Sequence, residues 1–187
     1  LSRIKDASPD VVWIQAQNPS TAALVHNGAQ QIMPDIDRID AGPTGGSAET
    51  WALMDPGALE GVVFLSTIDP SNPRLQTLAE RLGSTPEAAA NYAVLSYDGV
   101  KILAQAIEDA GTTEGDAVKT ALESISGYKA SFGAPDLTIS YSPTKHVGAD
   151  QLCGFVLRVF DAENQPGAVW ANAEPDCDSP AGNPRKG

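Results

Sequence analysis

Basic residues and long apolar runs are both scarce in this chain. Only 12 of the 187 residues are lysine or arginine, against 24 aspartates and glutamates, so the formal net charge is −12. Such an acidic surface repels nucleic acid and anionic membranes, and we expect neither as a partner. No apolar run approaches the roughly 20 residues that span a bilayer. Because 42% of the residues are hydrophobic, the composition predicts a well-solvated protein with a substantial core.

Histidine is scarce as well, and the usual residue patterns of catalysis and metal binding are missing. His26 falls inside a predicted helix, on what we expect to be its polar side, and His146 falls in a loop. His146 and Cys153 lack the two further ligands of a structural zinc site. No G-x-S-x-G motif is present, and no Ser-His-Asp order stands out. We therefore expect no cofactor and no metal, and we predict that the protein is not an enzyme.

Cys153 and Cys177 are the only cysteines, and two interpretations of them stay open. In an exported protein they would form a disulfide that closes a loop of about 25 residues and stabilises the fold by roughly 3 kcal/mol. In a cytosolic protein they would remain two free thiols.

The strongest periodic signal predicts one long helix over 86–111. Pro86 suits a first helical turn, where its missing N–H is not needed, and Gly111 supplies a stop. Apolar residues recur at steps of three and four, which places them on one face that must pack against a large surface. We expect this buried face to hold Tyr92, Leu95, Gly99, Leu103, Ala106 or Ile107, and Ala110.

Short apolar runs on either side of this helix predict strands. The run over 11–17 is typical of a strand covered on both faces, and Asn18 and Pro19 then begin a helix that ends near Met33. The first and last strands would share one sheet, while the helices between them would belong to a different body. Further strands are expected at 36–39, 62–68, 137–142, 154–161 and 168–172, and shorter helices at 50–53, 74–82 and 115–127.

Polar groups follow two of the predicted strands. Gln15, Gln17 and Asn18 end the first, and Thr44 and Gly45 lie in a glycine-rich loop after the second. Ligands of open α/β sheets bind beyond the carboxyl ends of the strands. Uncharged amides, a hydroxyl and backbone N–H groups can hold a small molecule without reacting with it. These residues predict a ligand-binding site, with ordinary capping and turn formation as the alternative explanation.

The order of these motifs resembles the C-terminal half of a type I periplasmic binding protein, and most closely the branched-chain amino acid receptors of ABC transporters. The resemblance covers nearly all of residues 1–171 and is carried by PDVVWIQAQNPSTAALVHNGAQQI, AGPTGG, LEGVVFLSTIDPSNP, NYAVLSYDGVKILAQAIEDAG and GAPDLTISYSPTKHVGADQLCGFVLRVFD. The EGVV strand, the aromatic-x-x-x-x-Tyr-Asp pattern and TISYSPTKHVG are its most specific parts. Tyr92, which opens the aromatic pattern, joins the ligand-binding candidates.

The resemblance implies an α/β fold, part of a two-lobe structure with the parallel sheet of lobe 2 and helices of lobe 1. Residues 1–64 would belong to lobe 2, 65–72 would cross the hinge, and 73–127 would form the helical part of lobe 1. Residues 128–172 would return through the hinge and supply the last strands of lobe 2, and 173–187 would be a poorly ordered tail. The first half of the family fold is missing, so we expect a fragment or a product whose signal peptide has been removed.

The resemblance also implies a function and a ligand class. Family members that hold α-amino acids carry a glutamate for the ammonium group where this chain has Thr44, and aromatic residues where it has Gln15, Gln17 and Asn18. A carboxylate binds a desolvated ammonium far better than a hydroxyl does. The expected ligand is therefore a carboxylate, an amide, a polyol, an aromatic acid or another amino acid-like molecule rather than leucine.

Three functional hypotheses follow. The first is an extracytoplasmic solute-binding protein, periplasmic or extracellular and in some cases lipid-anchored, that delivers its ligand to an ABC transporter permease. The second is a ligand-sensing domain of the same fold in a regulator or receptor, and the third is an enzyme. In each case the long helix would lack its covering sheet and expose an apolar strip, which favours a homo-oligomer.

Overall fold

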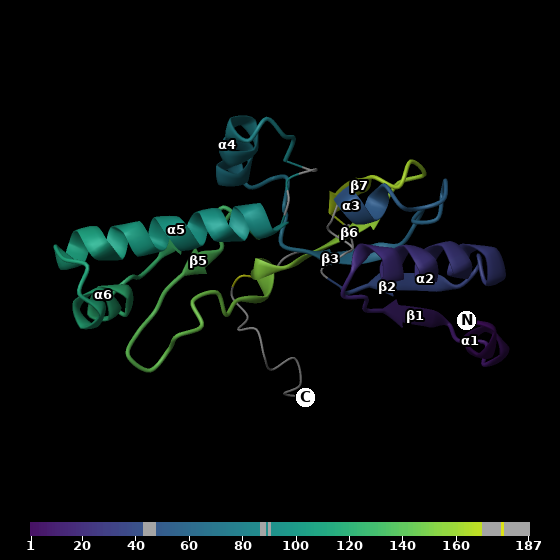
Figure 1. Cartoon of the computed structure of the whole chain (residues 1–187), viewed down its shortest axis with the longest axis horizontal. Helices are drawn as coiled ribbons and strands as arrows, with labels where there is room; N and C mark the ends of the chain where they lie inside the picture. The colour runs from purple at the N-terminus through teal and green to yellow at the C-terminus, as the bar shows by residue number, and fades with distance from the viewer. Residues whose placement is uncertain (43–47, 87–88, 90, 170–176, 178–187) are drawn as a thin grey trace. The chain divides into compact units, whose positions relative to one another are not determined.

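The computed structural model describes residues 1–42, 48–86, 89, 91–169 and 177. The chain folds into two compact units (Figure 1). Unit 1 spans Leu1–Ser66 and Val156–Glu174, and unit 2 spans Thr67–Phe155 and Pro175–Gly187.

Unit 1 is built on a mixed sheet of five strands in the order β1-β2-β3-β6-β7. The first three strands are parallel, whereas β6 is antiparallel to both β3 and β7. The predicted sharing of one sheet by the first and last strands is therefore confirmed. The elements of unit 1 are α1 (Ser2–Asp6), β1 (Val11–Ile14), α2 (Pro19–Ile32), β2 (Asp37–Asp40), α3 (Ala48–Trp51), β3 (Val63–Ser66), β6 (Val156–Phe160) and β7 (Pro166–Val169).

Strand β1 corrects one expectation, because it is covered on one face only. It pairs with β2 and lies at the edge of the described sheet. Ile14 is buried, but the side chain of Trp13 is 64% exposed and that of Val11 is 48% exposed. The apolar run VVWI alone could not distinguish an edge strand from a central one.

Helix α2 begins as the sequence predicts. The Oδ1 atom of Asn18 accepts a hydrogen bond from the backbone N–H of Thr21 at 2.8 Å, and Pro19 occupies the first turn. Ala22 and Ala29 are buried, and so is His26, which we had placed on the polar side. A polar partner on β2 explains this burial, as the site geometry below shows.

The core of unit 1 is aromatic. Phe64 of β3 stacks on Phe160 of β6 with ring centroids 4.2 Å apart, and Trp51 meets Phe160 edge-on at 6.0 Å. Leu59 and Val62 complete this buried cluster. Because β3 and β6 are far apart in sequence, this cluster ties the two segments of unit 1 together.

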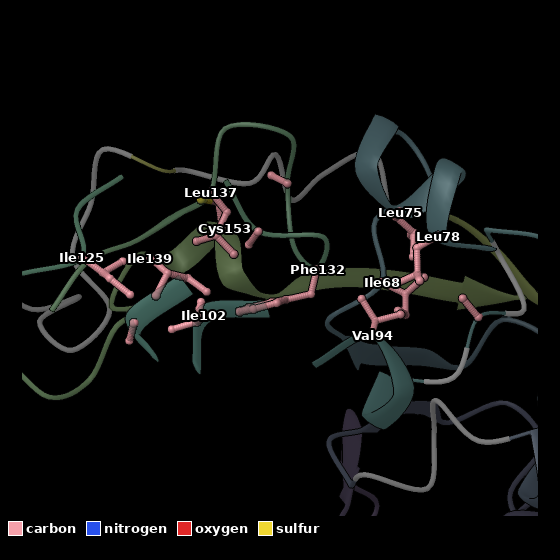
Figure 2. Close-up of a cluster of buried hydrophobic side chains, with 14 of the residues drawn as sticks. Ile68, Leu75, Leu78, Val94, Ile102, Ile125, Phe132, Leu137, Ile139 and Cys153 are labelled. Atoms are coloured by element: carbon pink, nitrogen blue, oxygen red, sulfur yellow. The ribbon is translucent and has the colours of Figure 1, made fainter. Parts of the chain in front are cut away.

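Unit 2 is mainly helical, and its elements surround a second core. The apolar cluster takes residues from every part of the unit, and Figure 2 shows Leu75 and Leu78 lying close to Ile68 and Val94. The elements are α4 (Pro73–Arg81), α5 (Asn91–Ala110), α6 (Gly115–Leu122), the antiparallel pair β4 (Tyr128–Lys129) and β5 (Thr138–Ile139), and a short 3-10 helix (Leu152–Gly154).

Helix α5 is shorter than predicted, and its buried face matches the prediction only in part. It begins at Asn91, and Pro86 lies in a turn outside it. Its buried residues are Val94, Asp98, Ile102 and Ala106. Ala106 was predicted to be buried, and Leu95, Ile107 and Ala110 pack against the core cluster as partly buried residues. The prediction was wrong for Tyr92 and Leu103, which are exposed, because Asp98 interrupts the apolar pattern of the buried face.

The chain leaves unit 2 at a later residue than expected from the sequence, which placed the return at residues 128–172. Residues 128–155 belong to unit 2, and the return to unit 1 occurs at Val156. The run over 137–142 contributes only the two-residue strand β5, which pairs with β4 instead of joining the large sheet. A short alternating pattern defines a strand but not its partner, which explains this difference.

Cys153 and Cys177 form a disulfide within unit 2. Cys153 is completely buried in the core cluster. The structure therefore supports the disulfide over two free thiols. In the chain-entropy model, closing this loop stabilises the fold by about 3 kcal/mol.

The expected poorly ordered tail, apart from Cys177, lies outside the described residues. Across the described ranges, none of the helices combines the length and the apolarity needed to cross a membrane.

Candidate functional site

The carboxyl ends of β1 and β2 lie side by side in unit 1. The two strands are parallel, and after their last paired residues the backbone N–H of Ala41 donates to the carbonyl of Ile14 at 2.9 Å. Gly42 then passes so close to Ala16 that a Cβ atom at position 42 would lie 2.6 Å from the Ala16 carbonyl oxygen. Only glycine fits such an approach. The chain therefore enters the glycine-rich loop directly beside the segment that follows β1.

The predicted ligand-binding residues fall into three groups. Gln15 and Gln17 follow β1 and are exposed at this edge of the sheet. Asn18 is also exposed, but its side-chain oxygen already caps α2. Thr44 and Gly45 lie outside the described residues. Tyr92 is exposed in the first turn of α5 and belongs to unit 2.

A buried hydrogen-bonded pair supports the carboxyl edge of the sheet. Asp40, the last residue of β2, is 1% exposed, and its Oδ2 atom lies 3.0 Å from Nε2 of His26, which is fully buried in α2. The Oδ1 atom of Asp40 accepts a hydrogen bond from the backbone N–H of Gly42 at 2.8 Å. One carboxylate thus fastens α2 to β2 and also fixes the backbone at Gly42.

Arg38 adds a second buried polar group on the same face of β2. Its guanidinium donates to the carbonyl of Ala58 at 2.8 Å and to the side-chain oxygen of Gln30 at 3.2 Å. Burial lowers the pKa of Arg38 from its ordinary value. Strand β2 therefore contacts α2 through buried polar groups, Arg38 with Gln30 and Asp40 with His26. Apolar side chains would be usual at such an interface.

Sequence analysis missed Asp40 and misplaced His26. The sequence of the strand, DRID, already indicated a polar face. Arg38 and Asp40 are two residues apart in it, so their side chains lie on the same face of the sheet. In a strand with a neighbour on each side, that pattern indicates either a solvated face or buried pairs. His26, on the face of α2 that packs on this strand, was the candidate partner for Asp40.

The carboxyl edge of β1 and β2 presents the exposed amides of Gln15 and Gln17 beside a tight backbone turn at Gly42, and the neighbouring Arg38 and Asp40 are engaged in structural contacts. Among the described residues, no group of three or more His, Cys, Asp or Glu side chains is placed to hold a metal ion.

Comparison with protein families decides the classification. The family described as periplasmic binding protein matches residues 1–161. The chain belongs to this family. No curated protein gave a significant match.

Solved structures agree with this periplasmic binding protein fold. The leucine binding protein LivK from Thermotoga maritima superposes with a TM-score of 0.70 at 19% identity, over 90% of this chain and 46% of that one. A periplasmic binding protein type 1 from Bordetella pertussis gives 0.70 at 16% identity, over 86% and 45%. The LivJ substrate binding protein from Streptococcus pneumoniae, in complex with isoleucine, gives 0.69 at 12% identity, over 90% and 47%.

These likenesses confirm the type I fold and the resemblance to branched-chain amino acid transporter binding proteins. The chain spans about half the length of the periplasmic binding proteins it matches. The family consists of extracytoplasmic binding proteins, which supports a solute-binding role.

Proposed function

We propose that the protein acts as the solute-binding component of an ABC transporter, capturing a small polar ligand between two lobes and delivering it to a permease. The family match supports the binding role, and the paired carboxyl ends of β1 and β2 support the position of the site. In this proposal unit 1 belongs to lobe 2, and the helices of unit 2 belong to lobe 1. The protein would work in the periplasm or outside the cell, free or held by a lipid anchor.

The proposed ligand carries an amide or a carboxylate. LivK is named a leucine binding protein, and LivJ was solved with isoleucine. In this chain Gln15 and Gln17 are the exposed side chains beside the loop, and an amide can both donate and accept a hydrogen bond. Thr44 brings no negative charge to an ammonium group. These residues match a polar, uncharged or anionic group better than the zwitterion of an aliphatic amino acid.

We predict that Gln17→Ala weakens ligand binding about tenfold, the loss expected for one hydrogen bond to a charged or desolvated group. Calorimetric titrations of the full-length protein with succinate, propionamide and leucine would identify the preferred class and measure the change. Gln31→Ala, which removes an exposed amide on α2 away from the sheet edge, is the control and should change affinity less than twofold. Sub-micromolar affinity for leucine would refute the proposed ligand class. Equal effects of the two variants would refute the site.

The exposed apolar face of α5 supports a second part of the proposal, the homo-oligomer. Val100 is 66% exposed and Leu103 is 46% exposed on the same helix as Tyr92. Leu103 also lines a hollow of about 440 Å³ with Ile102 and Leu122. We expect copies of the 187-residue chain to associate through this face, because an apolar strip of this kind gains free energy when it is covered.

Light scattering at increasing concentration tests this association. The mass should rise above that of one chain, and Leu103→Lys should lower it toward the monomer. A monomeric mass for the unmodified chain at high concentration would contradict the homo-oligomer.

A further inference from the structure

A basic groove lies on unit 2, on a chain that is otherwise strongly acidic. It is formed by α4, the middle of α5 and the segment that begins at β4, and its volume is about 550 Å³. Arg74, Arg81 and Lys129 line it, whereas none of its lining residues is acidic. Three of the chain's 12 basic residues thus meet in one hollow although the net charge is −12. The full set of lining residues is Pro73, Arg74, Thr77, Leu78, Arg81, Tyr97, Tyr128, Lys129 and Ser131.

The three cations have no carboxylate partner within the described ranges of the chain. The ion pairs found there join His26, Lys119, Lys145 and His146 to acidic residues, and none involves the basic groove. The buried carboxylate of Asp98 contacts the lining residues Tyr128 and Ser131 and offsets part of the positive charge. Three cations against one carboxylate still leave a local positive potential. A bound anion would neutralise it.

Arg74 is held in a fixed orientation. Its Nε atom donates to the carbonyl of Ala130 at 2.8 Å, and its Nη2 atom donates to the carbonyl of Pro135. A guanidinium has five N–H donors, so these two bonds orient the group and leave further donors for a ligand. Such preorganisation reduces the entropy lost on binding.

Aromatic side chains complete the groove. The Arg81 guanidinium lies 5.8 Å from the centre of the Tyr97 ring and donates to its hydroxyl at 3.3 Å. Tyr128 donates to the buried Asp98 carboxylate at 3.1 Å. Burial, with Asp98 as a further cause, raises the pKa of Tyr128 from its ordinary value. Tyr128 therefore stays neutral and adds no negative charge to the groove.

We propose that this basic groove binds the anionic group of a small molecule, a phosphate or a carboxylate, through Arg74, Arg81 and Lys129. The volume lies within the range of small-molecule sites, and guanidinium groups match the geometry of both kinds of oxyanion. The groove shares no residue with the solute site proposed above, so the two proposals can fail separately.

Calorimetric titration of the full-length protein with inorganic phosphate and with succinate, at constant ionic strength, tests the groove. Phosphate binding, or succinate binding that Lys129→Gln weakens and Gln17→Ala leaves unchanged, supports the proposal and separates the groove from the solute site. Lys129→Gln should weaken binding about tenfold, as expected for loss of a charge-assisted contact. Amide NMR signals of Lys129 and Ser131 should shift during the titration.

Lys101→Gln is the matched control, because Lys101 is an exposed lysine on α5 that does not line the groove. It removes the same charge and should change affinity less than twofold. The proposal is overturned if neither anion binds, if Lys101→Gln weakens binding as much as Lys129→Gln, or if the shifted amides lie elsewhere.

Discussion

Replacing Asp40 with alanine is expected to lower the free energy of unfolding by about 4 kcal/mol, because two buried groups lose their hydrogen-bond partner at about 1–3 kcal/mol each. The substitution leaves Nε2 of His26 without its partner in a fully buried position. It also removes the acceptor for the backbone N–H of Gly42. Urea denaturation followed by tryptophan fluorescence would measure the loss, because Trp51 lies in the core of the same unit.

Asp37→Ala provides the control for this experiment. Asp37 is the first residue of the same strand, but its side chain is exposed. Its substitution removes the same charge and should change the unfolding free energy by less than about 0.5 kcal/mol, as is usual for surface positions. Losses of similar size in the two variants would show that Asp40 acts through net charge and not through its buried contacts.

The second large effect is expected from Asn72→Ala, with a loss of about 3 kcal/mol. Asn72 is fully buried at the start of α4, and its Oδ1 atom caps the helix by accepting from the backbone N–H of Arg74 at 3.0 Å. Its Nδ2 atom donates to the carbonyls of Ala130 at 3.2 Å and Gly133 at 3.1 Å, with a longer contact to Phe132. Alanine loses the cap, worth about 1 kcal/mol, and leaves the carbonyl of Gly133 without its donor at about 1–3 kcal/mol, whereas the carbonyl of Ala130 keeps its bond from Arg74.

Asn18→Ala separates the cap from these carbonyl contacts. Asn18 and Asn72 both precede a proline in the first turn of a helix, and both cap it through Oδ1. Asn18 is exposed, so its substitution should cost only about 1 kcal/mol. Denaturant titration of the two variants would measure the difference. Equal losses would contradict the structural role assigned to the Asn72 amide.

These two asparagines show how far local sequence signals reach. Both Asn-Pro pairs can be recognised as helix starts, because capping involves only neighbouring residues. The bonds from Asn72 to Ala130 and Gly133 span about 60 residues of sequence, and no local pattern predicts them. The same distinction separates Asn18, whose cap was predicted, from His26, whose partner was not.

The candidate site divides in the same way. Gln15 and Gln17 could be identified because polar residues after an apolar strand must lie at the carboxyl edge of a parallel sheet. The support beneath that edge, Asp40 with His26, required the packing of α2 on β2. The face of α5 was predicted only in part, because the buried Asp98 on that face is stabilised by the backbone N–H of Ser131 at 2.6 Å and by Tyr128.

The sequence by itself determined the class of the fold, the positions of most strands and helices, and the family. Those features follow from periodicity and from turn residues, which act over a few neighbouring positions. Only the tertiary structure decided where the chain returns to unit 1, which polar residues are buried, and that basic side chains from α4 and β4 meet in one groove. Each of these depends on contacts between distant segments, and a buried polar group is stable only when such a contact supplies its partner.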